Sequence, residues 1–281
     1  MPGTLRTRIG IAVAVVGALA AGAAALLVFS WTIHETRFDR PDPAFDALAA
    51  DVTAVPGVSD VSGQRWVEAP PFLDPSSWMH VTADVSAFDA VRALACENAY
   101  PDAVSWSVDL DAAAGTRVSA SAAEERGCPA FGFDVEPVAS EIARVAPGSV
   151  VQAAVREPGL FAITSLDGAP SDALSGLLPL VAHADTLREV AGVGRETTVE
   201  VSGPQLGVEL APGEGAGYHS LLTALIADHG VTYFSFGGAG TPIDGVERVQ
   251  VRAPNAQHPA IERLIAGSGL PVASLPVAFL E

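Results

Sequence analysis

The sequence predicts an α+β protein in which one N-terminal transmembrane helix precedes two to three tandem, small αβ sandwich units. Two observations lead to this fold class. An uncharged run over 9–31 is long enough to cross a membrane, and the chain after it repeats one order of helical and strand-like segments three times. The alternative is one continuous α+β domain in which the repeated order arises by chance.

The uncharged run predicts the first element and the location of the protein. At the rise of an α-helix its 23 residues reach about 34 Å, enough for a hydrocarbon core of about 30 Å. Arg6 and Arg8 precede it, so the positive-inside rule places 1–8 in the cytoplasm and the later chain outside, as in a single-pass protein of the cell membrane. The alternative is a cleaved signal peptide; the length of the run and the terminal Trp31 favour a retained helix.

The chain is strongly acidic, which limits its partners. It carries 33 Asp and Glu residues against 15 basic residues, all of them arginine, for a formal net charge of −18. Nucleic acids and anionic lipid surfaces are bound through basic faces, so neither is expected as a partner of the exported part. The absence of lysine from the sequence excludes Schiff-base chemistry and nucleotide loops of the Walker type.

After the membrane segment we expect a tether over 32–43 and three units over 44–130, 131–212 and 213–281. Each unit shows a helix, two strands, a second helix, and then one or two strands. This order is related to the ferredoxin-like plan when a neighbouring strand completes the sandwich. Sequence identity between the units is too low to establish true repeats, so the division depends on the order of elements alone.

The first unit begins with apolar residues at helical spacing and continues with alternating segments. Phe45, Leu48 and Val52 predict an amphipathic first helix, and Phe88 and Val91 mark the second. The strand-like segments cover 58–67, 78–85, 103–110 and 116–122.

The second and third units repeat this pattern. Helices are expected around Val138 and Ile142, around Leu174 to Val181 with a kink or break at Pro179, around Leu221 to Ile226, and around Ile261 to Ile265. The strand-like segments cover 149–155, 160–166, 197–202, 205–211, 231–237, 246–252 and 271–279.

Cys96 and Cys128 are the only two cysteines, and the predicted topology brings both to the same end of the first unit. Outside the cytoplasm such a pair is usually a disulfide, so we expect a Cys96–Cys128 bond. The alternative is two free thiols. The cysteines do not form a CxxC motif, which excludes a thioredoxin-like redox site and a zinc knuckle.

The sequence predicts no cofactor and no metal. None of the six histidines has metal-ligand spacing, and His229 before Gly230 is typical of a helix C-terminus. The glycine-rich segment 212–217 follows a strand and opens a helix, as phosphate-binding loops do. However, Glu214 would repel phosphate, and Tyr218 stands where a dinucleotide fingerprint needs glycine.

A binding surface is predicted at one end of the third unit, where three glycine-rich connections are expected to meet. Tyr218 and His219 would supply an aromatic face and a hydrogen-bonding group, and the partner would be an envelope protein or a neutral polymer. The alternative is that the glycines only satisfy turns and helix caps. The glycines of the predicted surface are Gly213, Gly215, Gly217, Gly237 and Gly238, with Gly267 to Gly269 in the third connection.

Two classes of function therefore remain open. The first is a membrane-anchored, extracytoplasmic binding or scaffold protein of the bacterial cell envelope, because the sequence contains no catalytic motif. The second is an anchored, hydrolase-like envelope enzyme whose site is assembled from residues far apart in sequence. A pocket in which a histidine or paired carboxylates converge would favour the enzyme.

Overall fold

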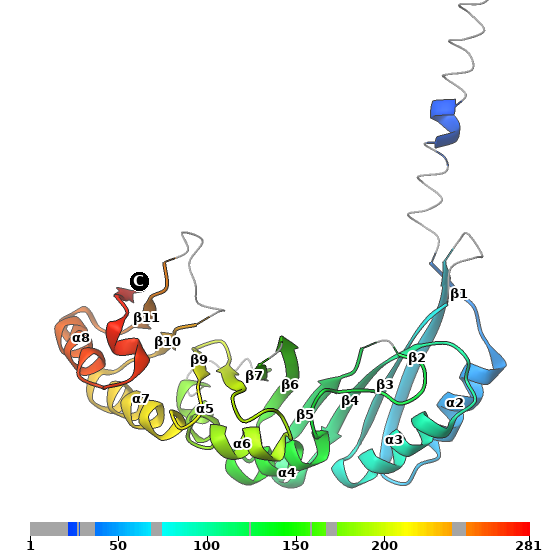
Figure 1. Ribbon diagram of the computed structural model, residues 1–281, viewed down its shortest axis with the longest axis horizontal. Helices are drawn as coiled ribbons and strands as arrows, with labels where there is room; N and C mark the ends of the chain where they lie inside the picture. The colour runs from blue at the N-terminus through cyan, green and yellow to red at the C-terminus, as the bar shows by residue number, and fades with distance from the viewer. Residues whose placement is uncertain are drawn as a thin grey trace, which may run out of the picture.

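The computed structural model describes residues 22–26, 28, 37–68, 75–123, 125–157, 159–166, 173–237 and 246–281. Its strands lie side by side along an arc, and its helices follow the outer side of that arc (Figure 1). Within these residues the strands form one 12-stranded mixed sheet, and their order across the sheet is their order along the chain.

The elements have the following bounds. The helices are α2 (Pro43–Thr53), α3 (Phe88–Glu97), α4 (Val135–Val145), α5 (Ala173–Ala182), α6 (Ala184–Val190), α7 (Gly215–His229) and α8 (His258–Ala266), with short 3₁₀ turns between some of them. The strands are β1 (Arg37–Asp39), β2 (Val58–Glu68), β3 (Ser76–Asp84), β4 (Val104–Asp111), β5 (Arg117–Ser121), β6 (Val150–Glu157), β7 (Leu160–Ser165), β8 (Thr198–Ser202), β9 (Leu206–Leu210), β10 (Tyr233–Ser235), β11 (Val249–Arg252) and β12 (Val277–Phe279).

The sheet alternates antiparallel hairpins with parallel crossovers. β2 and β3, β4 and β5, β6 and β7, β8 and β9, and β10 and β11 are antiparallel pairs. The pairs β3–β4, β5–β6, β7–β8, β9–β10 and β11–β12 are parallel, and at least one helix connects the two strands of each. In the described part of the chain, each parallel connection therefore contains one α-helix, except that β7 and β8 are connected by both α5 and α6.

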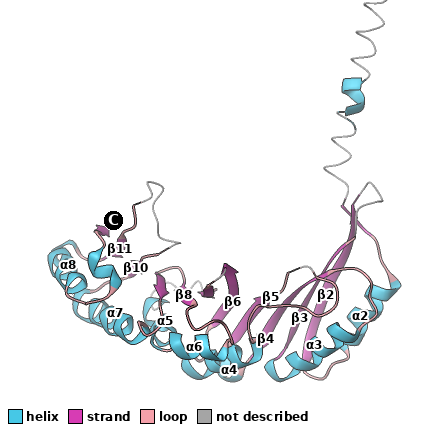
Figure 2. Ribbon diagram, in the orientation of Figure 1, coloured by secondary structure: helices cyan, strands magenta, loops and turns pink. Residues whose placement is uncertain are grey.

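All of these helices cover the same face of the sheet (Figure 2). In β4 the side chains of Val104, Trp106, Val108 and Leu110 are buried, whereas the alternating positions between them are only half-buried. Because successive side chains of a strand point to opposite faces, the buried set packs on the helices and the other set faces solvent. We call these two sides the helix face and the open face.

Local sequence explains where individual helices start and stop. Asp42 caps α2 because its carboxylate accepts hydrogen bonds from the backbone N–H of Ala44 at 2.8 Å and of Phe45 at 3.3 Å. At the other end of the chain, α7 ends at Gly230, whose φ of 64° is the left-handed conformation that glycine adopts freely. This confirms the predicted helix C-terminus at His229.

The crossovers alternate in hand. Successive crossovers step in the same direction across the sheet and lie on the same face, but they start from strands that run in opposite directions. Reversing the strand direction alone reverses the hand of a crossover. The sheet therefore contains parallel connections of the left-handed type, which is rare in proteins.

The prediction of separate tandem αβ units is wrong. β5 and β6, which would belong to the first and second units, are parallel neighbours with Arg117 opposite Val150. β9 and β10, from the second and third units, are also paired, with Leu206 opposite Phe234. Backbone hydrogen bonding continues across both of the predicted boundaries, so the three segments share one sheet. β1 pairs with β2, so part of the predicted tether over 32–43 also belongs to the sheet.

The predicted transmembrane helix over 9–31 and the single-pass membrane location are contradicted. In the part of the chain that the structure describes, no helix combines the length and the apolar character needed to cross a membrane. Of the predicted run, only 22–26 and 28 belong to that part. The remainder of the run, and the predicted cytoplasmic segment 1–8, lie outside the described residues.

Candidate functional site

A row of polar residues crosses the open face from β2 to β11. Each member is paired by register with the next, so the row runs perpendicular to the strands. We call these residues the polar row: Asp60, Thr82, Asp109, Ser119, Gln152, Thr164, Ser202, Gly207, Ser235 and Gln250.

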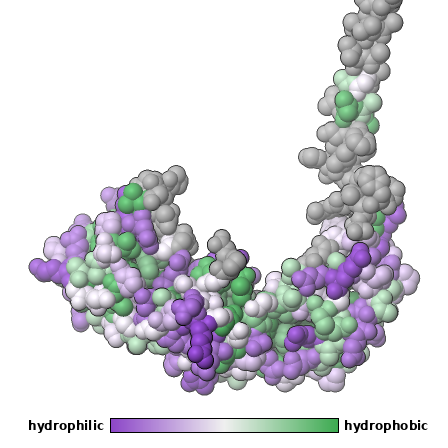
Figure 3. All heavy atoms as spheres, in the orientation of Figure 1, coloured by the Kyte–Doolittle hydropathy of each residue, from purple (hydrophilic) through white to green (hydrophobic). Residues whose placement is uncertain are grey.

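The open face is unsuited to burial against an apolar layer. Hydroxyl, amide and carboxylate groups dominate the polar row, and burial of such groups without hydrogen-bond partners is costly. The polar row therefore suits the open face to contact with water or with a partner that offers hydrogen bonds. On the outer side of the arc, where the helices lie, the space-filling view shows a mixture of hydrophilic and hydrophobic residues (Figure 3).

One histidine cluster lies on this face. The Nδ1 atom of His80 in β3 is 3.0 Å from the Oγ atom of Ser107 in β4, and its Nε2 atom is 3.5 Å from the Oδ2 atom of Asp109. Ser119 in β5 donates a 2.6 Å hydrogen bond to the other carboxylate oxygen of Asp109. Four side chains from three neighbouring strands are thus joined.

The cluster contains the residue types of a catalytic triad but lacks its surroundings. A triad needs backbone N–H groups aimed at the developing oxyanion. β4 is paired on both sides at Ser107, with His80 on β3 and Ser121 on β5, so the ladders on either side engage the backbone at this point. The geometry supports hydrogen bonding of a ligand rather than acyl transfer.

A second cluster ties β6, β7 and β8 together on the open face. Both amino groups of the Arg156 guanidinium take part: one lies 3.3 Å from each carboxylate oxygen of the buried Glu200, and the other donates to Thr164 at 3.0 Å. Thr164 and Ser202 share a further hydrogen bond of 3.1 Å. The hydrogen bond between Thr164 and Ser202 links neighbouring members of the polar row. The Arg156 guanidinium also compensates the negative charge of Glu200, whose burial without a partner would be costly.

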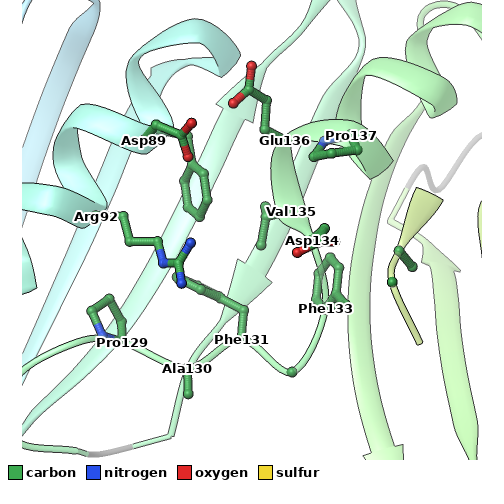
Figure 4. Close-up of a pocket in the computed structure, with 14 residues that line it drawn as sticks. Asp89, Arg92, Pro129, Ala130, Phe131, Phe133, Asp134, Val135, Glu136 and Pro137 are labelled. Carbon is green, nitrogen blue, oxygen red and sulfur yellow. The ribbon is translucent and has the colours of Figure 1, made fainter. Parts of the chain in front are cut away.

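The helix face contains a separate pocket of about 480 Å³ between α3, the start of α4 and the segment 129–134. Figure 4 shows Arg92 extending from α3 beside Phe131, with the carboxylates of Asp89 and Glu136 also in view. Arg92 forms no ion pair or hydrogen bond with the rest of the described chain. The lining includes no histidine, cysteine or serine among the described residues, so the pocket offers no nucleophile with a base beside it.

The predicted disulfide is present. Cys96 at the end of α3 and Cys128 form a disulfide with Cα atoms 4.1 Å apart. The bond holds the segment that leads to the helix-face pocket against α3. Among the described residues no three side chains of His, Cys, Asp or Glu are grouped to hold a metal ion.

Several residues of the predicted glycine-rich surface have packing roles. Gly213 has a φ of +84°, and its N–H donates to Asp185 at 3.0 Å. A side chain at Gly215 would lie 2.6 Å from the carbonyl oxygen of Val181, and one at Gly217 would lie 2.8 Å from Leu270. Glycine is needed at Gly215 because the neighbouring backbone approaches the start of α7 so closely, whereas at Gly217 the close atom is the terminal methyl group of the flexible Leu270 side chain.

The remaining predicted residues lie in different environments. Tyr218 is fully buried and stacks on Phe236 with ring centroids 5.0 Å apart, so it offers no exposed aromatic face. His219 is half-buried on α7. Gly237 has a φ of +89° and packs close to Glu209, whereas Gly238 lies outside the described residues. Whether this end of the sheet binds a partner stays a prediction.

Sequence reasoning missed the polar row, although a signal was present. The segment 103–110 alternates apolar and polar residues, and so identifies Ser105, Ser107 and Asp109 as one face of a strand. The register that aligns such faces across the sheet is set by long-range pairing. Comparison with known proteins adds no further guide: no protein-family model matches the chain, and no curated protein or solved structure does so either.

Proposed function

We propose that this protein is a binding or scaffold protein that holds an uncharged, hydrogen-bonding partner on the open face of its sheet. The observation that carries the proposal is the polar row, which crosses ten paired strands on a face that the described helices leave uncovered. Its members from β2 to β8 and in β11 are half-buried or exposed, whereas Gly207 and Ser235 in β9 and β10 are buried. Such a face offers many weak hydrogen-bonding positions in a regular array, which suits an extended partner.

Charge restricts the kind of partner. The chain has a formal net charge of −18, and Asp60 and Asp109 belong to the polar row itself. Anionic polymers are therefore repelled, as are nucleic acids. The serine, threonine and glutamine side chains can both donate and accept, so they pair with hydroxyl or amide groups without a charge on the partner.

A hydrolytic enzyme is the second candidate, and the His80 cluster is the observation that favours it. We place it second because His80 lies on a sheet surface whose neighbouring strands are fully paired, and because the helix-face pocket holds no histidine. Ser107→Ala would abolish a triad-dependent reaction, but it would remove only one of many hydrogen bonds from a binding face.

Site-specific photocrosslinking in intact cells tests the proposal. p-Benzoylphenylalanine replaces Gln152, which is exposed on the open face, or Ser140, which is exposed on the helix face in α4. Benzophenone inserts into C–H bonds of proteins and of sugars, so it does not select the partner class in advance. Crosslinks from position 152 and none from position 140 are expected. Crosslinks from position 140 alone would contradict the proposal.

A further inference from the structure

Two tryptophans project from the open face near its β1 end. In β2 and β3 the register pairs Gln64 with Trp78 and Trp66 with Ser76, so the tryptophans are diagonal neighbours on adjacent strands. The odd-numbered positions 63 and 65 of β2 belong to the helix face, because a side chain at Gly63 would meet Phe45 of α2 and Arg65 donates a hydrogen bond to Tyr100. Diagonal positions are within reach of aromatic side chains, so the pair forms one surface.

Trp78 is exposed and Trp66 is half-buried. Trp78 is 37% exposed, which places it among the few large hydrophobic side chains at the surface of the described chain. The side chain could have been covered by a helix, since the opposite face of the same strand is covered in this way. The exposed indole of Trp78, which lies among polar residues near the β1 end of the open face, therefore needs an explanation.

The neighbours of the pair are hydrogen-bonding groups. Gln64 and Ser76 are the cross-strand partners already named, and Trp78 is paired on its other side with Ser105 of β4. These three residues carry no charge. On the β1 side the backbone of Trp66 is paired with that of Asp39.

We infer that Trp66 and Trp78 form a stacking platform for sugar rings, and that the partner of the open face is a neutral polysaccharide. An indole ring presents a flat apolar surface that matches the C–H face of a pyranose ring, while amide and hydroxyl groups at its margin bond the ring hydroxyls. Binding sites commonly combine such an aromatic surface with a few placed polar groups. This inference rests on the proposed function and names the partner.

The geometry favours a neutral sugar over a cation. A cation is held best when aromatic rings surround it, whereas this pair lies on one side of a sheet and covers one face of a ligand only. The platform and the polar row lie at different levels along the strands: Trp78 is paired with Gln64 and Ser105, whereas Thr82, four residues further along β3, is a member of the polar row. One hexose advances an extended glycan chain by about the spacing of neighbouring strands, roughly 4.8 Å, so a chain that crosses the platform meets Gln64 on β2 and Ser105 on β4.

The platform is held in place from the helix face. Arg65, between Gln64 and Trp66, is 3.1 Å from the carboxylate of Asp102 and donates to Tyr100, also at 3.1 Å. The Tyr100 hydroxyl in turn lies 2.8 Å from Ser77 in β3. The two strands that carry the tryptophans are thus fixed to each other by side chains on the far face, and the platform loses little freedom on binding.

The test measures binding of the full-length chain to soluble neutral oligosaccharides by titration calorimetry. The probes are hexasaccharides of β-1,4-linked glucose, of β-1,4-linked N-acetylglucosamine, of α-1,4-linked glucose and of α-linked mannose. The variants are the double substitution Trp66→Ala with Trp78→Ala, the conservative Trp78→Tyr, and Tyr233→Ala as a control on the same face at the opposite end of the sheet.

At least one probe should bind the natural chain, with little change between low and high salt because no charges pair. The double variant should bind roughly tenfold or more weakly, Trp78→Tyr should retain most of the affinity, and Tyr233→Ala should change it less than about threefold. No binding of any probe, or equal binding by the double variant, overturns the inference.

The outcome is separable from that of the proposed function. Loss of the glycan result together with intact crosslinking from position 152 would overturn the polysaccharide alone and leave the open face as a binding surface. Salt-sensitive binding of a cationic probe such as tetramethylammonium, in place of the glycans, would also overturn it. Loss of both the glycan result and the crosslinks would overturn the binding function as well.

Discussion

At the scale of single residues, Tyr218 shows what the sequence does not reveal. Its position at a helix start beside three glycines predicts an accessible aromatic face, yet the structure buries it against Phe236. Its surroundings come from η5 (Pro271–Ser274), about 50 residues later, whose Val272 backbone lies near its hydroxyl without making a hydrogen bond of normal geometry. Burial and the nearby Glu214 carboxylate raise the pKa of Tyr218 far above its ordinary value.

Tyr218 is therefore expected to act in stability. Tyr218→Ala should lower the free energy of unfolding by about 3–5 kcal/mol, because it removes a buried aromatic ring and leaves a cavity. Tyr218→Phe keeps the ring and removes a hydroxyl without a partner, so it should change stability by less than about 1 kcal/mol. Urea unfolding monitored by circular dichroism measures both. Equal losses of unfolding free energy in the two variants would show that stacking of the Tyr218 ring does not stabilise the fold.

Asp185 links a predicted site residue to the pH dependence of stability. Partial burial acts to raise the pKa of Asp185, but the hydrogen bond from the Gly213 N–H and the contact with Arg188 outweigh burial and hold the pKa below its ordinary value. A carboxyl group whose pKa is lower in the folded state stabilises the fold above its unfolded pKa of about 3.9, and that stabilisation is lost as the pH falls through the folded pKa.

Asp185→Asn should therefore lower the melting temperature at pH 7, and the difference from the natural chain should shrink as the pH falls below about 4. Thermal melts between pH 7 and pH 2.5 measure it. Asp51→Asn, on the exposed side of α2, serves as the control for removal of a surface carboxylate and should change the melting temperature at pH 7 little. A difference that stays constant with pH would contradict the role assigned to the carboxylate.

At the scale of elements, the spacing of apolar residues and the positions of turn residues such as glycine and proline located most helices and strands. The alternation in 103–110 became β4, and the apolar spacing from Phe45 became α2. Of the kink or break expected at Pro179, the break does not occur: α5 continues through Pro179 to Ala182, and the chain turns at His183 before α6. A proline early in the last turn loses one N–H group, while packing of α5 on α7 preserves the rest of the helix.

Two glycines within helices give opposite predictions. Gly176 in α5 has open space around it, so Gly176→Ala should stabilise the fold by about 0.5–1 kcal/mol through helix propensity. Gly215→Ala would place a methyl group 2.6 Å from the Val181 carbonyl oxygen and should destabilise by about 1–3 kcal/mol. Chemical denaturation of the two single variants compares them. Stabilisation by Gly215→Ala would show that α5 and α7 are not closely packed there.

The disulfide closes a loop with a sequence separation of 32 residues. Replacing Cys96 and Cys128 together by serine should lower the free energy of unfolding by about 3–4 kcal/mol in the chain-entropy estimate. The same loss should follow addition of a reductant to the natural chain, and reductant should have no further effect on the double variant. A double variant as stable as the natural chain would remove the structural role of the bond.

At the scale of the whole molecule, one continuous sheet joins the three segments that the sequence pattern predicts as separate units. The element order in 44–130, 131–212 and 213–281 is what the pattern indicates, but a pattern of short segments contains no statement about which strands pair. The pairs β5–β6 and β9–β10, which cross the predicted boundaries, depend on tertiary contacts that the order of elements does not specify. For the same reason the sequence could supply the polar residues of the open face but not their alignment into one row.

Continuity of the sheet also determines how the molecule unfolds. Strand pairing and the buried core continue across the boundary at β5–β6, so 44–130 and 131–212 should unfold together in one transition. Hydrogen exchange followed by mass spectrometry should give similar protection for β4 and β7. Different protection of β4 and β7 would contradict this prediction and show that 44–130 and 131–212 unfold as separate units.

The claim that the open face binds the partner is tested most directly by oxidative footprinting in living cells. Hydroxyl radicals modify exposed side chains, and matched pairs report the two faces: His80 and Leu166 on the open face, His219 and Leu264 on the helix face. Relative to the purified protein, His80 and Leu166 should be oxidised several-fold less in cells, while His219 and Leu264 should be unchanged. Unchanged oxidation of His80 and Leu166, or protection of His219 and Leu264 alone, would contradict the claim.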